Sequence, residues 1–312
     1  MNKKFLQIPK RTLLFLIVIV VIIGIGVFLN ATRKTKDFKE VNGINQNVVV
    51  NDSLEEAIHL AVLEYNKNES MLADLACEDH IILTTKEDEK KQTMTVYAMV
   101  LYEEYELING QIEDTTETRG SYIPTALTFD KKGEKQYILS EYWVPGDGSD
   151  YAPDIKKKFP KEVVEDAINN PTYINYQKQN IYQELMKEGY LDAEKMITKA
   201  INHIIQIKDT APDWEIAADQ RDLTYYGDAM LTYAYKHFLK GQQTEEKAYI
   251  METACRDILK QFQEDMAFGN KKGQEWFDAY LSALKEYEET KGIEFVKENM
   301  PKGYLLLMMN EE

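Results

Sequence analysis

The chain has 312 residues, with 53 acidic and 37 basic side chains, a net charge of −16 and two cysteines. The first 39 residues hold eight Lys or Arg and one Asp, so the body that follows carries a net charge of −23. A surface this acidic repels phosphates and anionic lipids, which argues against nucleic acid as a partner of the body. Two cysteines exclude a disulfide-dense scaffold.

An uncharged run covers residues 12–32 and reads TLLFLIVIVVIIGIGVFLNAT. A single helix of this length crosses the ~30 Å hydrocarbon core of a bilayer at about 1.5 Å per residue. The alternative is a cleaved signal peptide, which has a shorter apolar region and small residues before the cut. Leu29 fits poorly three positions before a cut after Ala31. We therefore expect a retained transmembrane helix, with residues 1–11 as a cytoplasmic tail.

The basic residues on the two sides of this run do not fix its orientation. Four Lys or Arg precede it and four follow it within the first 39 residues, so the positive-inside rule gives a tie. The N-terminal amine and the signal-anchor layout, a short basic tail before a long polar body, favour an extracytoplasmic body at the cell membrane. The alternative is a body inside the cell that acts as a scaffold.

Residues 33–50 lack helical periodicity and are predicted to form a tether. Ser53 and Glu56 have the spacing of a capping box, which predicts that a helix begins at Ser53. The residues that follow place their apolar side chains on one face at helical period: Leu54, Ala57, Ile58, Ala61, Val62 and Tyr65.

From about residue 76 the hydrophobic period changes to two, which is typical of strands. We expect strands over residues 80–85, 93–107, 121–129 and 136–144, the last two joined by a turn at 130–133. One helix followed by a meander of strands predicts an α+β lobe over residues 51–152, with the helix on one face of an antiparallel sheet.

After Pro153 the pattern becomes helical, and residues 153–312 are predicted to form a helical bundle lobe. Apolar stripes at helical period run over residues 196–205, 223–238, 251–262 and 276–287. Gly241 and Gly292 are expected to end two of these helices. The predicted fold class is α+β: an N-terminal transmembrane helix, a small helix-on-antiparallel-sheet lobe, and a mostly helical bundle lobe.

No motif for metal or cofactor chemistry is complete. The HExxH pattern of zinc proteases is absent, and Cys77-Glu78-Asp79-His80 has the spacing of only half a zinc site. Ser282 and Lys285 match S-x-x-K, but the companion S-D-N and K-T-G elements are missing. His237 lies on an apolar stripe, which favours a hydrogen-bonded core histidine over a ligand. We expect no metal, no cofactor and no catalytic residue.

The end of the last predicted strand and the loop that follows it combine aromatic and acidic side chains. A loop held by a rigid sheet is a suitable place for a binding site. The predicted binding residues are Tyr142, Trp143, Asp147, Ser149, Asp150 and Tyr151. The alternative is a connector that caps the next helix, and a second alternative is calcium bound by Asp147, Asp150 and Asp154, although the spacing is not that of an EF-hand.

Several segments between residues 75 and 165 resemble a region of the BlaR/MecR-type antirepressor membrane metallopeptidases of Gram-positive bacteria. These segments are residues 100–105 (VLYEEY), 127–129 (LTF), 141–149 (EYWVPGDGS) and 154–160 (DIKKKFP). In that family such a segment follows the membrane-embedded protease region, so the resemblance implies an extracytoplasmic sensor or accessory domain. The chain has one predicted span rather than several and no HExxH, so the protease activity is not implied.

The sequence therefore predicts a single-pass, membrane-anchored extracytoplasmic binding, sensor or accessory protein without catalytic activity. Residues 12–32 contact the membrane, and the partner of the body is a protein or a small ligand. The alternative is a membrane-anchored extracytoplasmic hydrolase with an unrecognised site, for which two carboxylates in a deep pocket, or Cys255 beside His237, would be the signature. Whether Cys77 and Cys255 form a disulfide is left open.

Overall fold

The computed structural model describes residues 38–41, 44–47, 53–67, 73–113, 119–133, 136–169, 172–241 and 243–310. The chain divides into two units, residues 1–48 and 49–312. In the first unit, β1 (Phe38–Val41) and β2 (Ile44–Asn47) pair as an antiparallel hairpin inside the predicted tether. No helix within the ranges given above has the length and apolar character needed to cross a membrane. The predicted transmembrane helix at residues 12–32 lies outside these ranges.

The second unit is α+β and is built around a four-stranded antiparallel sheet. Its strands are β3 (Leu75–Asp88), β4 (Thr93–Tyr105), β5 (Arg119–Lys131) and β6 (Tyr137–Trp143), in the order β3-β4-β5-β6. Neighbours in sequence are neighbours in the sheet, as short connections between antiparallel strands require. The four predicted strands are therefore confirmed, with β3 beginning earlier than expected.

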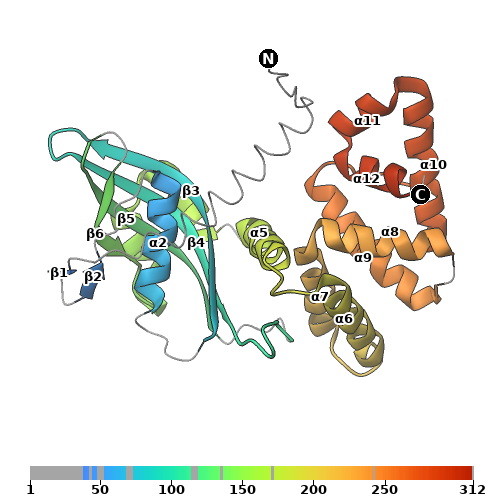
Figure 1. Ribbon diagram of the computed structural model, residues 1–312, viewed down its shortest axis with the longest axis horizontal. Helices are drawn as coiled ribbons and strands as arrows, with labels where there is room; N and C mark the ends of the chain where they lie inside the picture. Colours follow the sequence, from blue (N-terminus) through green and yellow to red (C-terminus); the bar gives the residue numbers. More distant parts are fainter. Residues whose placement is uncertain are drawn as a thin grey trace, which may run out of the picture. The chain divides into compact units, whose positions relative to one another are not determined.

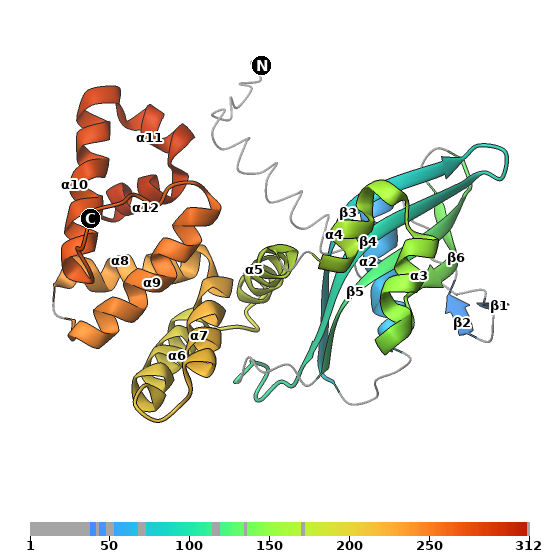
Figure 2. The ribbon, with the colours of Figure 1, turned by 180° about the vertical axis from the view of Figure 1, so that it is seen from behind.

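Both faces of the sheet are covered by helices (Figure 1, Figure 2). Alternate residues of β4 point to opposite faces, so one set packs against α2 (Leu54–Lys67): Val96, Ala98, Val100 and Tyr102. The other set packs against α3 (Tyr151–Lys158) and α4 (Val164–Asn169) through Tyr97 and Met99. The sequence predicted the helix on the first face and missed the helical cover of the second.

The helix α5 (Thr172–Lys187) packs on the sheet by hydrogen bonds and an ion pair. The Gln177 amide donates to the carbonyl oxygens of Asp79, at 2.7 Å, and Met99, at 3.1 Å. Lys178 forms a buried ion pair with Glu103. These bonds compensate the desolvation of polar groups that the contact buries. Helix α3 includes residue 152, and both α3 and α4 pack on the sheet. A domain boundary at residue 152 stays a prediction.

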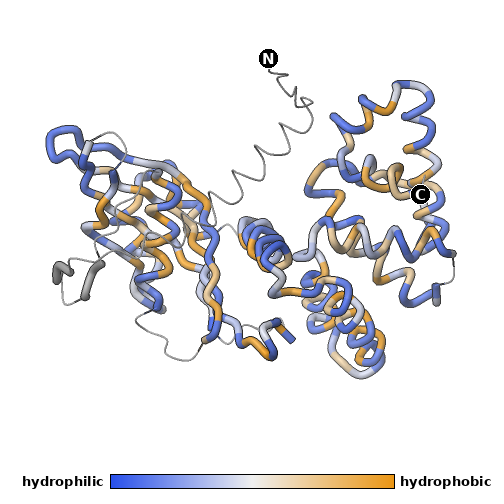
Figure 3. The backbone as a smooth tube through the Cα atoms, viewed as in Figure 1, coloured by the Kyte–Doolittle hydropathy of each residue, from blue (hydrophilic) through white to orange (hydrophobic). Residues whose placement is uncertain are grey.

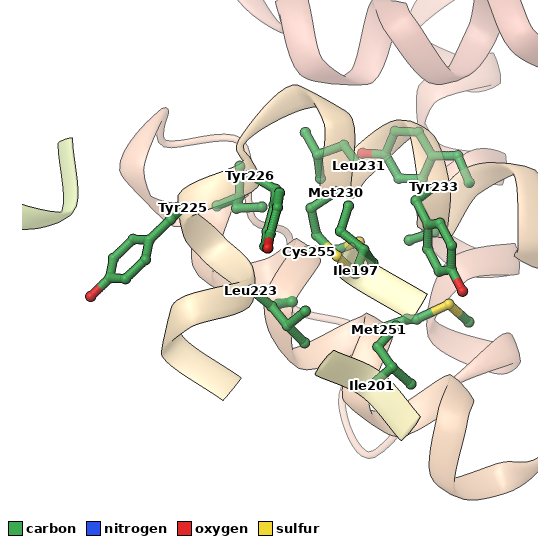
Figure 4. Close-up of a cluster of buried hydrophobic side chains, with 14 of the residues drawn as sticks. Ile197, Ile201, Leu223, Tyr225, Tyr226, Met230, Leu231, Tyr233, Met251 and Cys255 are labelled. Carbon is green, nitrogen blue, oxygen red and sulfur yellow. The ribbon is translucent and has the colours of Figure 1, made fainter. Parts of the chain in front are cut away.

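The rest of the unit is helical and surrounds one apolar core. Its helices are α6 (Ala193–Ile207), α7 (Asp213–Asp222), α8 (Asp228–Lys240), α9 (Glu245–Gln261), α10 (Gln274–Lys291), α11 (Ile293–Asn299) and α12 (Pro301–Asn310). Figure 4 shows side chains from several of these segments meeting in the core, among them Ile197, Met230 and Cys255. Hydrophobic and hydrophilic residues alternate along the helices and strands, as amphipathic elements require (Figure 3).

The predicted helix boundaries have mixed outcomes. Gly241 ends α8 in the left-handed conformation, with φ of 66°, and Gly292 follows α10, so both predictions are confirmed. The apolar stripe over residues 223–238 is interrupted, because Gly227, at φ of 50°, separates the short 3₁₀ helix η3 (Leu223–Tyr226) from α8. Helix α9 ends at Gln261, although its apolar stripe continues to Phe262.

Candidate functional site

The six residues predicted to bind at the end of the sheet do not converge on one surface. Tyr142 and Trp143 are consecutive in β6, so their side chains point to opposite faces. Tyr142 stacks on Tyr65 of α2, with ring centroids 3.8 Å apart, and burial raises its pKa. Trp143 packs near Phe159 on the other face, with ring centroids 5.9 Å apart. Both aromatic rings therefore take part in packing the layers of the fold.

The loop after β6 forms a turn that leads into α3. Asp147, Ser149 and Asp150 are exposed, and residues 148–150 form the 3₁₀ helix η1 (Gly148–Asp150). Asp154 accepts a hydrogen bond of 3.0 Å from the backbone N–H of Gly146, while Tyr151 packs beside the core between the sheet and α3. This geometry is that of a loop that connects β6 to the N-terminus of α3. Binding by the six residues stays a prediction.

A pocket of about 370 Å³ lies between α6 and α8. Helix α6 contributes two residues from its first turn, Ala193 and Glu194. Helix α8 contributes residues at intervals of three and four, which a helix places on one face: Ala229, Thr232, Tyr233, Lys236, His237 and Lys240. The pocket thus combines an apolar wall, one buried aromatic ring and several groups that carry charge or hydrogen-bond donors.

The side chains around His237 link the pocket to α9. The rings of Tyr233 and His237 have centroids 4.4 Å apart, and Lys247 of α9 places its ammonium 5.3 Å from the centroid of the Tyr233 ring. Lys247 Nζ lies 3.5 Å from His237 Nε2. Thr198 of α6 donates a hydrogen bond of 3.1 Å to the Tyr233 hydroxyl. The buried ring of Tyr233 is therefore held in place from both neighbouring helices.

The pocket has a positive local field. Burial, followed by the charges of Lys247 and Lys240, lowers the pKa of His237, while Glu194 acts in the opposite direction. A lowered pKa favours the neutral imidazole, as expected for a histidine that is surrounded by positive charges. Among the described residues, Lys236, Lys240 and Lys247 have no ion-pair partner. Of these three lysines, Lys236 and Lys240 line the pocket, and both are exposed on α8 to an anionic ligand.

Nucleophiles are not assembled at this pocket. Cys255 is fully buried in the helical core, and burial raises its pKa, so its thiol is neutral and inert. Cys77 is also a free thiol, with a pKa raised to about 12 chiefly by burial. Ser282 and Lys285 of the S-x-x-K motif are both exposed on α10. The arrangement can hold and orient a ligand by charge and hydrogen bonding.

A second cluster of titratable groups joins α2 to β3. The buried carboxylate of Glu78 lies 2.6 Å from His59 Nδ1 and 3.2 Å from His80 Nδ1. His80 Nε2 lies 2.9 Å from a carboxylate oxygen of Glu55, on the first turn of α2. Burial favours a higher pKa for Glu78, but the hydrogen bonds from the two histidines outweigh it and hold the pKa below its ordinary value.

The pKa values of both histidines in this cluster are raised. For His59 the largest cause is its hydrogen bond to Glu78, and for His80 the bonds to Glu78 and Glu55 outweigh burial. Burial also raises the pKa of the neighbouring Asp79 to about 6, against a hydrogen bond from Asn180. In the described ranges, no group of three or more His, Cys, Asp or Glu side chains has a geometry that could hold a metal ion.

Comparisons with known proteins give no match: no family model fits the chain, and neither a curated protein nor a solved structure is significantly similar to it. The resemblance to the antirepressor metallopeptidases stays an expectation. Sequence reasoning missed the pocket between α6 and α8, and it placed His237 in the core although the residue is half-buried at the pocket wall. The available signal was the close spacing of Lys236, His237 and Lys240 in a strongly acidic chain.

Proposed function

We propose that this protein is a single-pass, membrane-anchored binding or sensor protein whose extracytoplasmic body binds a small ligand between α6 and α8. The proposed architecture is a transmembrane helix at residues 12–32, then the helix-and-sheet region, then a helical bundle. The observation that carries the binding role is the pocket, whose lining combines the buried Tyr233 with two exposed lysines of the same helix, Lys236 and Lys240, that have no ion-pair partner among the described residues. Such a mixture of an apolar wall and a few polar groups is typical of ligand sites.

A non-catalytic role is supported by the distribution of reactive groups among the described residues. Both thiols have raised pKa values, so neither is present as a thiolate nucleophile at neutral pH. The pocket contains one carboxylate, Glu194, rather than the pair that general acid and base chemistry at a hydrolase site uses. These features favour recognition over turnover.

The placement of the body is tested by protease protection of the full chain with a C-terminal tag. Digestion of the tag in intact cells is expected, because the proposed body lies outside the membrane. Protection until lysis would place the body inside the cell and overturn this part of the proposal. An untagged cytoplasmic protein, followed by its own antibody, serves as the control for cell integrity.

The pocket is tested by a saturation-transfer NMR screen of the full chain in neutral detergent micelles, with acidic, neutral and basic fragments. Ala229→Trp places an indole in the pocket and is expected to abolish the signals of bound fragments. Ala217→Trp adds the same ring at an exposed site on α7 and is expected to leave them unchanged. Circular dichroism checks that both variants fold. Fragment signals that persist in Ala229→Trp would show that the ligand site lies elsewhere.

A further inference from the structure

The pocket between α6 and α8 has a charge balance opposite to that of the surrounding body. Lys236 and Lys240 line it, and Lys247 reaches its wall through His237. The one carboxylate in the lining is Glu194, whereas the body as a whole carries a net charge of −23. A positive region in an acidic protein attracts anions, and both Lys236 and Lys240 are exposed on α8, where an anion can reach them.

The size and the lining of the pocket limit the ligand. A volume of about 370 Å³ lies at the small end of the range of roughly 300–1,000 Å³ found for ligand pockets. The methyl groups of Ala193 and Ala229 and the ring of Tyr233 provide an apolar wall beside the charged groups. A suitable ligand therefore has one compact anionic group and a short neutral part.

We propose that this pocket binds a small phosphate monoester, with the ammonium groups of Lys236 and Lys240 on the phosphate oxygens. This inference rests on the pocket being the ligand site proposed above. A phosphate dianion has three strongly accepting oxygens and so engages several ammonium donors at once. His237 lines the same pocket and lies 3.5 Å, through Nε2, from a third ammonium group, that of Lys247.

Removing the charge of Glu194 should change phosphate affinity in the direction opposite to removing the lysine charges. It is exposed on the first turn of α6 and lines the same pocket as the two lysines, so its charge repels a phosphate. Removing that charge while keeping the shape of the side chain should strengthen phosphate binding. A pocket that recognises a neutral or cationic ligand would respond to the same change with unchanged or weaker binding.

Isothermal titration calorimetry of the full chain in neutral detergent micelles at low ionic strength tests the assignment. The probes are sn-glycerol 3-phosphate, inorganic phosphate and glycerol. We expect both phosphates to bind, the monoester more tightly, and glycerol to give no heat. Lys236→Ala combined with Lys240→Ala should weaken monoester binding about tenfold or more, and Glu194→Gln should strengthen it about threefold.

The matched control is Lys285→Ala, which removes one exposed lysine of α10 and should leave the affinity unchanged. Absence of heat with both phosphates, tighter binding of inorganic phosphate than of the monoester, or an equal loss in Lys285→Ala would overturn the assignment. If neutral fragments still bind in a manner sensitive to Ala229→Trp, only the ligand class fails. If no fragment binds, the proposed binding function fails as well.

Discussion

Two sets of basic side chains in this protein differ in their partners. In the sheet region, His59, His80 and Lys178 lie against the buried carboxylates of Glu78 and Glu103. In the helical region, the lysines around His237 have no described carboxylate within ion-pair distance. Paired cations contribute to folding because their removal leaves a buried charge, whereas unpaired cations at a pocket contribute little to stability and are free to contact a ligand.

The largest expected effect is the loss of the buried ion pair of Lys178. Lys178→Met keeps much of the side-chain volume but leaves Glu103 buried without its cation, and we expect a loss of about 3–5 kcal/mol in the free energy of unfolding. Urea denaturation measures this change. The double variant Lys178→Met, Glu103→Gln should recover part of it. A loss below about 1 kcal/mol in the single variant would contradict a structural role for the pair.

A smaller loss is expected when the carboxylate that holds both histidines is neutralised. Glu78→Gln should lower the free energy of unfolding by about 1–3 kcal/mol at pH 6, because the hydrogen bonds from His59 and His80 lose their charged acceptor. Glu89→Gln, at an exposed turn, is the matched control and should be neutral. Equal stability of the two variants would show that the cluster does not hold α2 on β3.

Within the cluster, the two histidines and the Glu78 carboxylate predict opposite dependences of stability on pH. The pKa values of His59 and His80 are raised, so their contribution is complete below the ordinary value of 6.5 and is lost as the pH rises through the folded-state pKa. The lowered pKa of Glu78 adds a contribution that is present above 4.5 and is lost as the pH falls through its folded-state pKa. The cluster therefore stabilises the fold most between these two values.

The combined variant His59→Gln, His80→Gln tests this window. The groups facing these histidines are Glu55 and Glu56 of α2, Glu78 and Asp79 of β3, and Glu184 of α5. Thermal unfolding between pH 5 and 8 should lose the part of its rise toward acid that the histidines contribute, an effect below about 1 kcal/mol. The raised pKa of Asp79, about 6, contributes a separate rise toward acid that this variant keeps. Asp79→Asn removes the titration near pH 6 of the neighbouring carboxyl. An unchanged profile in the histidine variant would contradict the assignment.

The smallest effect is expected at the pocket. Burial and the charges of Lys247 and Lys240 lower the pKa of His237, so its contribution is complete above 6.5 and is lost as the pH falls toward the folded-state pKa. His237→Gln should remove this loss and leave stability at pH 8 within about 0.5 kcal/mol of the parent. Chemical denaturation at pH 5.5 and 8 measures both points. A large loss at pH 8 would show that His237 is structural.

The sequence predicts most of the helices and strands, but it does not predict which side chains from different helices and strands lie together. The helix at Ser53 was predicted from local chemistry, and the backbone N–H of Glu56 donates to Ser53 Oγ at 3.2 Å in the structure. The strands followed from their period of two. Tyr142 and Trp143 are predicted to bind because aromatic and acidic groups meet at the end of a rigid sheet, but as adjacent strand residues they face opposite sides and pack in different layers.

The pocket depends on contacts that are distant in sequence, such as Thr198 with Tyr233 and His237 with Lys247. Local patterns do not specify which helices become neighbours. The same limit applies to Glu78, whose partner His59 lies on a different element. In the sequence, Cys77-Glu78-Asp79-His80 indicates only half of a metal site and gives no sign of a contact with His59.

The covering of β4 on both faces has a consequence for hydrogen exchange. Between Val96 and Leu101 this strand pairs with β3 on one edge and β5 on the other, and helices cover both of its faces. Its amide hydrogens therefore exchange with solvent through opening of the whole surrounding structure rather than through local fraying. The rate at which β4 amides of a deuterated chain lose deuterium to water therefore reports the free energy of global unfolding of this region.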